Sequence, residues 1–420
     1  MRSASKLKEA IIFVHPLILV SVFCVLCASV VKLAAQDWKA VHDGVEYAQV
    51  EHKIGKDPVK INLLRLDLTK VRLDVHKALD KAIGLETTSS IANRKGAVAA
   101  INAGFFRLDK SEFAGDSAGV LMIDGKLLSE STDNRVGAII GTFRKSGFVF
   151  FGHLNAYTQL YFGERSVTHS FQLSGTNRQL NKDEAVVYDS FFGPFTPPNK
   201  DGVNISLGRC KRGKRVNTFS TFTCSRYSIV TKSSGTSIPR GGFVLSVGPD
   251  FFNQVDPSIT KLHKVLVSGR NLAFQIKETI DSRGSYNIDK NFDVVNGVPQ
   301  LIKDGKIDIT WEEEKASRAF VFNRHPRTAV AKLKDGKFLM VTVDGRQPGV
   351  SVGMTLQELA EYLLSLGAVD AMNLDGGGST TMVLDGKVVN KPSDPTGERK
   401  IGDAIVVTLR KPARQASRKN

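Results

Sequence analysis

The chain has 420 residues, of which 58 are Lys or Arg and 42 are Asp or Glu, so its formal net charge is +16. Hydrophobic residues make up 41% of the chain and charged residues 24%, a composition that excludes a disordered polyelectrolyte. A basic chain of this kind fits nucleic acid, an anionic glycan, a phosphate-bearing substrate or a membrane surface, and the charge alone does not select among them.

The N-terminal segment has the pattern of a secretory signal. Three basic residues precede a largely apolar run over residues 10–31, and small residues follow at Ala34 and Ala35. This order is typical of a signal peptide that is cleaved after Ala35 or nearby. An uncleaved anchor is the alternative, because the run approaches the length that spans a bilayer. We expect residues 1–36 to direct the protein to a secreted, periplasmic or cell-surface location.

Export changes how the four cysteines are interpreted. Cys24 and Cys27 lie inside the targeting segment, so their spacing is not a metal or redox motif of the mature protein. In an oxidising compartment we expect Cys210 and Cys224 to form a disulfide, with two separate buried thiols as the alternative. The surrounding residues 202–249 contain eight Lys or Arg and no acidic residue.

The first half of the mature chain is predicted to be rich in strands. Apolar and polar residues alternate over 59–68 and 71–75, which indicates half-buried strands. Residues 87–94 predict a short helix, and an apolar strand follows at 97–101. Asp-Gly supplies the positive φ of tight hairpins, and such pairs separate apolar runs at 124–125, 304–305, 335–336 and 385–386. These hairpins predict antiparallel sheet.

The strongest helix is predicted over residues 355–366. Thr355 and Glu358 form a capping-box pattern, one face is apolar, and Gly367 can end the helix. The predicted fold class is therefore α+β, with mostly antiparallel sheets and a few flanking helices in one large domain. We expect residues 37–90 to be an N-terminal strand-rich region packed on the main domain, 91–408 to be the main domain, and 409–420 to be a basic tail.

The sharpest candidate site is a glycine-rich segment behind a predicted strand. The residues that follow this strand are Asp375, Gly376, Gly377, Gly378, Ser379, Thr380 and Thr381. Consecutive glycines cost chain entropy, so we expect them where the backbone approaches another group closely. Their amides can form an anion-binding nest, although a simple glycine-rich turn is the alternative. A Walker-type loop is excluded, because its Lys is absent and a strand follows instead of a helix.

A second cluster lies around two predicted strand ends. Asp344 and Arg346 follow a predicted strand over 338–343, and Arg327 and Thr328 begin another. The two guanidinium groups suit bidentate binding of phosphate or carboxylate. Taken singly, Asp344 and Arg346 fit ordinary turn residues equally well. We expect His325 to orient a loop.

A third cluster combines amide and aromatic side chains. Asn102 ends an apolar strand, where its amide binds substrate or caps a turn. Phe105 suits stacking on a sugar ring, although an aromatic core is the commoner use. Asn296 is a companion amide from a distant segment.

The order of these motifs resembles the phosphodiester glycosidase family. The segments that carry the resemblance are Asn-Ala-Gly-Phe-Phe at 102–106, Val-Asn-Gly at 295–297, His-Pro-Arg-Thr-Ala at 325–329, Asp-Gly-Arg at 344–346, Gly-Met-Thr-Leu at 353–356 and Asn-Leu-Asp-Gly-Gly-Gly-Ser-Thr at 373–380. It covers roughly residues 90–408, so the predicted main domain is a phosphodiester glycosidase domain. His325 and Val298 depart from the usual pattern but leave Arg327 and Asn296 in place.

The resemblance implies an exported hydrolase that cleaves the glycosidic bond of a sugar-1-phosphodiester, such as an N-acetylglucosamine-1-phosphodiester, in glycans or envelope polysaccharide. A phosphomonoester leaves readily, since its second pKa is about 6, so less acid assistance is needed than for an ordinary glycoside. Asp375 is then the base or nucleophile, Asp344 its partner, and Arg327 and Arg346 hold the phosphodiester. The expected substrate-binding residues are Asn102, Phe105, Asn296, Thr328, Gly376, Gly377, Gly378, Ser379, Thr380 and Thr381.

Two other functions stay open at this point. One is a phosphodiesterase that breaks the P–O bond with a divalent metal, and the other is a non-catalytic envelope protein that binds exopolysaccharide. The sequence lacks an H-x-H motif or a dense Asp/His set, which argues against a two-metal site, so no cofactor or metal is indicated and dependence on a divalent metal is left open. We expect a phosphate-linked glycan as partner and no nucleic acid, with membrane contact only through an N-terminal anchor. The sugar, the aglycone and the oligomeric state are left open.

Overall fold

The alternating segments of the chain pair into antiparallel sheets, as their pattern predicts. The computed structural model describes residues 36–143, 145–163, 169–213, 219–231, 234–268, 273–282 and 292–410. Residues 1–35 of the expected signal and 411–420 of the expected basic tail lie outside the described residues. Residues 37–420 form one unit.

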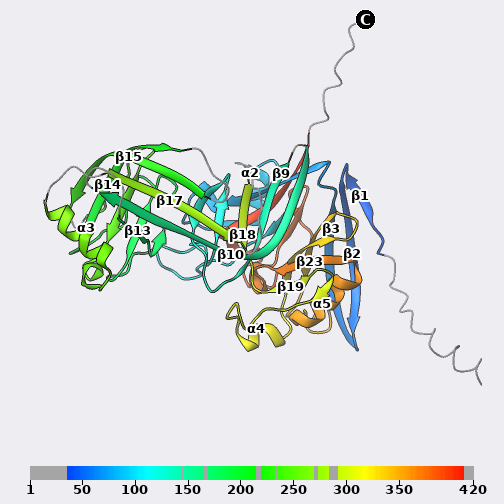
Figure 1. Cartoon of the computed structure of the whole chain (residues 1–420). Helices are drawn as coiled ribbons and strands as arrows, with labels where there is room; N and C mark the ends of the chain where they lie inside the picture. Colours follow the sequence, from blue (N-terminus) through cyan, green and yellow to red (C-terminus); the bar gives the residue numbers. More distant parts are fainter. Residues whose placement is uncertain are drawn as a thin grey trace, which may run out of the picture. The chain divides into compact units, whose positions relative to one another are not determined.

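The first sheet has eight strands, and every pair in it is antiparallel. Leu63 and Val341 pack with helix α5 (Leu356–Ser365) on one face, while Leu64 and Met340 belong to the core on the other (Figure 1). The strands in spatial order are β1 (Lys39–His42), β2 (Val45–Ile54), β3 (Asp57–Leu66), β22 (Phe338–Val343), β21 (Arg327–Leu333), β23 (Ala368–Asn373), β19 (Gln300–Lys303) and β20 (Lys306–Ile307).

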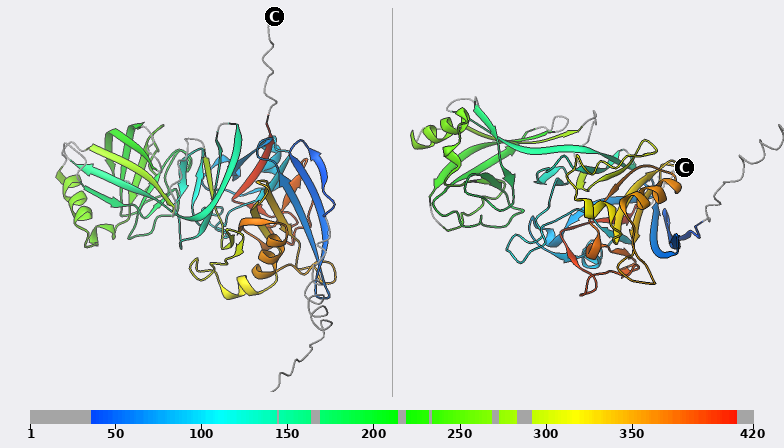
Figure 2. Two further views of the ribbon diagram at one scale, coloured as in Figure 1. Left: turned by 45° about the vertical axis from the view of Figure 1, so that its right-hand side comes forward. Right: turned by 90° about the horizontal axis from the view of Figure 1, so that it is seen from below.

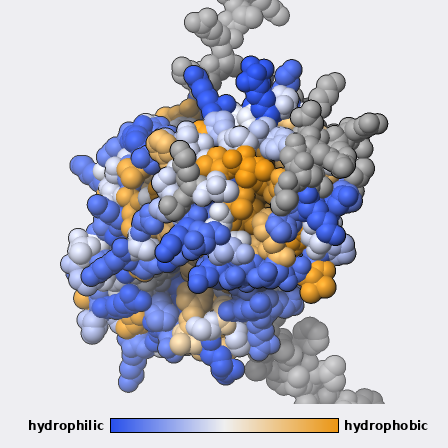
Figure 3. All heavy atoms as spheres, turned by 90° about the vertical axis from the view of Figure 1, so that its left-hand side faces the viewer, coloured by the Kyte–Doolittle hydropathy of each residue, from blue (hydrophilic) through white to orange (hydrophobic). Residues whose placement is uncertain are grey.

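The second sheet has twelve strands and is antiparallel except for the β12–β13 pair. In spatial order its strands are β12 (Gly175–Thr176), β13 (Ala185–Tyr188), β16 (Phe243–Val247), β14 (Val203–Arg212), β15 (Phe219–Val230), β17 (Ala273–Ser282), β10 (Ser146–Gly163), β9 (Val136–Phe143), β18 (Phe292–Asn296), β7 (Leu121–Ile123) and β8 (Lys126–Ser129), with β11 (His169–Gln172) paired to β10. The long strand β10 reaches from β9 to the green strands at the far end of the sheet (Figures 1 and 2). The surface at that end is mostly hydrophilic, with hydrophobic side chains gathered near its centre (Figure 3).

Two smaller sheets complete the fold. The five-stranded sheet has the order β25 (Lys387–Val388), β24 (Met382–Leu384), β6 (Ala99–Asn102), β27 (Asp403–Leu409) and β4 (Val71–Lys77), and the two-stranded sheet joins β26 (Lys400–Ile401) to β5 (Glu86–Thr87). The expected hairpin turns are present, since Asp124 and Gly125 have φ of 50° and 70°, and Asp385 and Gly386 have φ of 49° and 73°.

Helices are few and short among the described residues. They are α2 (Thr88–Arg94), α3 (Pro257–Ser268), α4 (Arg318–Phe322) and α5, with 3-10 turns at η1 (Ala78–Asp80), η2 (Phe251–Asn253) and η3 (Gly377–Ser379). The predicted cap of α5 is confirmed: Glu358 N donates to Thr355 Oγ1 at 3.1 Å, and Thr355 N donates to Glu358 Oε2 at 2.9 Å. Gly367 follows with φ of 88°.

The predicted antiparallel architecture is confirmed, but the structure is mostly β rather than α+β. The reason is that the sheets pack against one another, and not mainly against helices. One hydrophobic cluster contains Leu64 from the eight-stranded sheet, Ile405 from the five-stranded sheet and Ala138 from the twelve-stranded sheet. Burial of apolar surface between sheets leaves helices only peripheral positions. None of the described helices is both long and apolar enough to span a bilayer.

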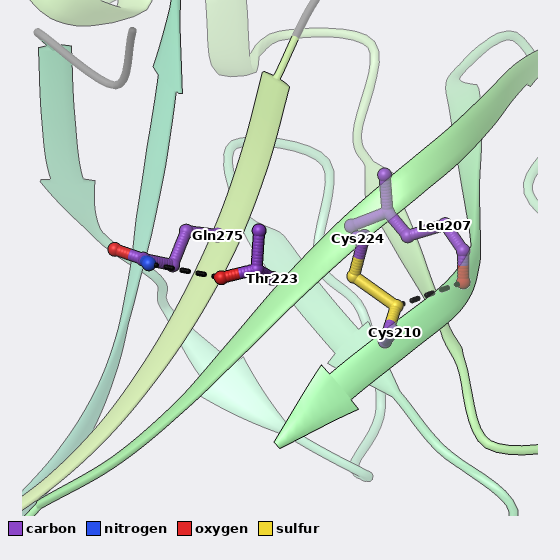
Figure 4. The surroundings of a disulfide bond; sticks show 5 residues. All are labelled: Leu207, Cys210, Thr223, Cys224 and Gln275. Atoms are coloured by element: carbon purple, nitrogen blue, oxygen red, sulfur yellow. Dashed lines mark hydrogen bonds between the residues drawn. A yellow bond between two sulfur atoms is a disulfide. The ribbon is translucent and has the colours of Figure 1, made fainter. Parts of the chain in front are cut away.

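The predicted disulfide between Cys210 and Cys224 is confirmed. It links β14 to β15 within the twelve-stranded sheet, where the two cysteines are directly paired in register (Figure 4). In the same region Gln275 Nε2 of β17 donates to Thr223 Oγ1 of β15 at 3.1 Å. Residues 214–218 of the basic loop that the disulfide encloses lie outside the described residues.

Candidate active site

The candidate site is assembled from strand ends of different sheets. Asp375 follows β23 of the eight-stranded sheet, and Asn102 ends β6 of the five-stranded sheet. The two segments are joined because Asn102 Nδ2 donates to Asp375 O at 2.6 Å and Asp375 N donates to Ala103 O at 3.0 Å. This connection brings the first and last predicted motifs of the chain into one place.

Each of the three glycines after Asp375 is required by a close neighbour. A Cβ added at Gly376 would lie 2.8 Å from Pro326 O, one at Gly377 would lie 3.0 Å from Arg346 Nη2, and one at Gly378 would lie 2.2 Å from Arg399 Nη2. Two guanidinium groups therefore pack directly on this backbone. Side chains at these positions would displace them, which accounts for the glycines physically.

The amides of the glycine segment are largely used within the protein. Gly377 N donates to Pro326 O at 2.9 Å, and Ser379 N donates to Gly376 O at 3.1 Å. The N–H groups of Gly377 and Ser379 are therefore not free for the anion-binding nest that the sequence suggests. The positive groups at this loop are the arginine side chains.

Asp375 carries the carboxyl group at the centre of the cluster. Burial raises its pKa to about 6, although the Ser379 hydroxyl, the Arg399 charge and the Gly376 N–H lower it. The charge of Asp403 raises the pKa further. Asp375 thus changes its ionisation close to neutral pH, which suits a group that transfers protons or attacks an electrophile.

Asn102 acts as a clamp on this loop. Its Oδ1 accepts from Thr328 Oγ1 at 2.9 Å and from Thr381 N at 3.0 Å, while its Nδ2 binds the Asp375 carbonyl. Asn102 and Thr328 are both fully buried. The predicted substrate contacts of these two side chains are thus replaced by contacts inside the protein, and both residues position Asp375.

Arg327 is buried, and two of the three nitrogen atoms of its guanidinium group donate hydrogen bonds to backbone carbonyl groups. Nε donates to Met354 O at 2.8 Å, and Nη2 donates to Phe320 O at 2.7 Å and to Asn323 O at 3.0 Å, at the end of α4. Burial lowers the pKa of Arg327 to about 9. Of the three guanidinium nitrogen atoms, only Nη1 has no hydrogen-bond partner among the described residues. Bidentate binding of phosphate, which the sequence predicts, is therefore not available to this side chain.

Arg346 is placed differently. Its side chain is exposed, packs against Gly377, and belongs to no ion pair among the residues that the structure describes. Its backbone φ of 59° is uncommon for a residue with a side chain. Arg346 is therefore an accessible cation beside the glycine loop.

Asp344 is oriented by a neighbouring loop and not by Asp375. Its Oδ1 accepts from Asn390 Nδ2 and from Lys391 N, each at 3.1 Å. Asn390 Nδ2 also donates to Thr380 O at 3.0 Å, so one amide bridges Asp344 and the glycine segment. Burial raises the pKa of Asp344. The charge of Asp403 is among the causes that raise the pKa of Asp375.

Asn296 and Phe105 border the same region. Asn296 Oδ1 accepts from Phe105 N at 3.3 Å, while its buried Nδ2 has no partner among the described residues. Phe105 packs edge-on against Phe320, with ring centroids 6.0 Å apart. The buried hydroxyls of Thr380 and Thr381 are also without partners. These polar atoms offer hydrogen bonds to a sugar or a water molecule.

Comparisons with known proteins agree with the motifs. Residues 225–408 match the family model described as phosphodiester glycosidase. The predicted family resemblance is confirmed. Bovine N-acetylglucosamine-1-phosphodiester alpha-N-acetylglucosaminidase is 38% identical over 110 residues, which are 24% of this chain and 20% of the bovine protein. The human enzyme of the same name is 36% identical over 110 residues, 24% of this chain and 21% of that protein. The chain thus aligns with about a fifth of each of these curated relatives.

Longer but more distant similarities support the fold. An uncharacterized protein of Rickettsia conorii is 26% identical over 261 residues, 60% of this chain and 77% of that protein. A hypothetical protein from Synechocystis has a TM-score of 0.68 at 23% identity, covering 88% of this chain and 62% of its own. An exported protein from Burkholderia pseudomallei has a TM-score of 0.67 at 23% identity, covering 84% and 74%.

Three charged residues at this site were not predicted from sequence. Arg399 packs on Gly378 and donates to Asp394 Oδ2 at 2.6 Å, and Asp403 and Lys77 are buried behind the glycine loop. Arg399 and Asp403 lie in the segment Glu-Arg-Lys-Ile-Gly-Asp-Ala at 398–404, which ends the stretch that resembles the family, so their place in that segment was a signal for them. Lys77 ends an ordinary alternating strand and has no local signal. Among the described residues, no group of three His, Cys, Asp or Glu side chains is arranged to hold a metal ion.

Proposed function

We propose that this protein hydrolyses the glycosidic bond of sugar-1-phosphodiesters, with an N-acetylglucosamine-1-phosphodiester as the model substrate. One observation carries the proposal. The exposed guanidinium of Arg346, which has no carboxylate partner among the described residues, packs against Gly377, two residues after Asp375. An unneutralised cation thus lies against the loop that follows Asp375, a carboxyl group whose pKa is raised to about 6.

The chemistry follows from these two groups. Arg346 binds the phosphodiester anion through charge-assisted hydrogen bonds. Asp375, in its carboxylate form, either attacks the anomeric carbon or removes a proton from an attacking water molecule. The bond between the anomeric carbon and oxygen breaks, and its electron pair leaves with the phosphate. Where Asp375 attacks, a water molecule then displaces it from the anomeric carbon and the carboxylate is restored. The products are the free sugar and a phosphomonoester, whose second pKa of about 6 makes it a good leaving group.

The relatives support this substrate class. The bovine and human proteins are named for cleavage of N-acetylglucosamine-1-phosphodiesters, and the family model is that of the phosphodiester glycosidases. We also propose that the protein is exported, on the basis of its N-terminal signal pattern and its similarity to the exported protein from Burkholderia pseudomallei. A phosphate-linked glycan or envelope polysaccharide is the natural substrate that fits this location.

Hydrolysis in ¹⁸O-labelled water tests the bond that is cleaved. A synthetic N-acetylglucosamine-1-phosphodiester is incubated with the full chain, and the products are analysed by mass spectrometry. We expect the label in the free sugar and an unlabelled phosphomonoester. Label in the phosphate would show a P–O-cleaving phosphodiesterase instead. Absence of turnover with binding of phosphate-linked glycans would favour the non-catalytic alternative.

A further inference from the structure

A second buried carboxyl group lies behind the proposed reaction centre. Asp403 begins β27, is completely buried, and its Oδ1 accepts from Gly104 N at 2.7 Å. The neighbouring Ala103 N donates to Asp403 O at 3.1 Å, and Ala103 O accepts from Asp375 N at 3.0 Å. Residues 103 and 104 therefore separate the two aspartates and hold each of them.

Gly104 lies in close contact with polar groups of the site. A Cβ added there would lie 2.9 Å from Asn296 Nδ2 and 3.1 Å from Asp403 Oδ1. The glycine thus lets the Asp403 carboxylate approach the segment that binds Asp375. A larger residue would push the carboxylate or the Asn296 amide out of place.

A buried cation accompanies Asp403. Lys77, at the end of β4, is only 2% exposed, and its Nζ donates to Ser117 Oγ at 2.9 Å and to Gly115 O. Ser117 Oγ in turn donates to Asp403 Oδ2 at 3.5 Å. A Cβ added at Gly402, the residue before Asp403, would lie 3.2 Å from Lys77 Nζ. The lysine therefore supplies a nearby positive charge that favours the ionised form of Asp403, against the effect of its burial.

We propose that Asp403 is a positioning residue of this site, whose buried carboxylate, held by Gly104 N–H and balanced by Lys77, controls the ionisation of Asp375. This inference rests on the proposed function only in giving Asp375 a catalytic task. The charged groups that act on Asp375 are Arg399 and Asp403, those on Asp403 include Lys77, and those on Lys77 include Asp116.

The sign of the effect follows from the charges. Burial is the main cause that raises the pKa of Asp375, and the negative charge of Asp403 raises it further. Burial also raises the pKa of Asp403, while Lys77 lowers it and so favours the carboxylate. Replacing Asp403 by Asn removes a negative charge and keeps an oxygen for Gly104 N–H. The pKa of Asp375 should then fall.

Carbon-13 NMR of aspartate carboxyl groups measures this directly in the full chain. The Asp375 signal is assigned by its loss in Asp375→Asn, and its titration is followed in the wild type, Asp403→Asn, Lys77→Met and the double variant. We expect the Asp375 midpoint to fall by roughly half a pH unit or more in Asp403→Asn. Lys77→Met should lower it as well, by favouring neutral Asp403, and the double variant should match Asp403→Asn.

The double variant and a control substitution at a distant carboxyl group show whether a change in the Asp375 titration comes from Asp403. Lys77→Met with Asp403→Asn removes both buried charges together, so it avoids an unpaired ion that would destabilise the fold. Asp293→Asn replaces another buried carboxyl group, which binds Val75 N and Asp124 N, and should leave the Asp375 titration unchanged. An unchanged Asp375 midpoint in a folded double variant would overturn the inference. Turnover by the wild type, measured separately, tests the proposed function, and its absence would leave the NMR result standing.

Discussion

At the scale of single residues, the site depends on which charged side chains lack a partner and are exposed. Arg327 and Arg346 have the same side chain, yet one is buried with its fork bound to carbonyl groups and the other is exposed beside the glycine loop. The sequence places both in one motif cluster and does not distinguish them, because burial depends on distant segments. In the structure the buried arginine holds α4, whereas the exposed one is the residue that we propose to bind the phosphodiester anion.

Asp375→Asn should abolish most of the hydrolysis of an N-acetylglucosamine-1-phosphodiester. An amide neither accepts a proton at neutral pH nor attacks the anomeric carbon, so we expect kcat to fall by roughly 10²-fold or more. Asp304→Asn, at the β19–β20 hairpin, is the matched control and should keep kcat within about twofold. An Asp375→Asn protein with wild-type kcat would remove Asp375 from the mechanism.

The raised pKa of Asp375 also predicts how activity depends on pH. A group that must act as a carboxylate is active above its pKa and is lost as the pH falls through it, so kcat/KM should decline below about pH 6. Initial rates between pH 4 and pH 8 check this. A flat profile across that range would exclude Asp375 as the essential base or nucleophile.

Arg346→Lys should weaken substrate binding while leaving the fold intact. Lysine keeps the charge but loses the planar fork, so we expect kcat/KM to fall by about tenfold, mainly through KM. The side chain is exposed, so the unfolding midpoint should not change. Arg318→Lys, on α4, serves as a control, and equal kinetics for both variants would argue against phosphate binding by Arg346.

At the scale of elements, the sequence predicts those features that depend only on residues close to one another in the chain. Helix α5 and its capping box need only Thr355 and Glu358, and the Asp-Gly hairpins need only two adjacent residues, so both were predictable. The glycine loop was predictable as a site but not in its contacts. Arg399 packs on Gly378 through pairing of distant strands, and no pattern around residue 378 indicates it.

Gly378→Ala tests the role of this packing. The new Cβ would lie 2.2 Å from Arg399 Nη2, so the guanidinium must move away from Ser379 and Asp375. We expect kcat/KM to fall by at least roughly tenfold, because small displacements of catalytic groups are costly. Gly152→Ala in β10 is matched to it, since a Cβ there meets nothing within 4 Å, and its kinetics should be those of the wild type.

At the scale of the whole molecule, three sheets share one core, and the site lies where their strands end. The strands that contribute to it are β6, β18, β21, β22, β23 and β27. The alternation of apolar and polar residues in these strands predicts sheet structure. The sequence contains no signal that tells which sheets pack on one another, so it favours an α+β fold class. The same long-range pairing hides Lys77 and Asp403, which belong to neighbouring strands β4 and β27 although they are distant in sequence.

Buried acids should also make stability depend on pH. Burial raises the pKa of Glu278, in β17, to about 7, above the usual value for an unfolded chain. The folded state then holds a proton that the unfolded state has released, so the stability contribution of Glu278 is lost as the pH rises from about 4 to about 7. Glu278→Gln should therefore gain stability relative to the wild type between pH 5 and pH 8, by up to roughly 3 kcal/mol. Urea titrations at both pH values check this, and a pH-independent difference would contradict it.

The account as a whole depends on the products released from a sugar-1-phosphodiester. The most direct test incubates the wild type and Asp375→Asn with an N-acetylglucosamine-1-phosphodiester and quantifies free sugar, sugar-1-phosphate and phosphomonoester together. We expect equal amounts of free N-acetylglucosamine and phosphomonoester from the wild type and neither from Asp375→Asn. Release of sugar-1-phosphate, or equal release by both proteins, would contradict the proposed function.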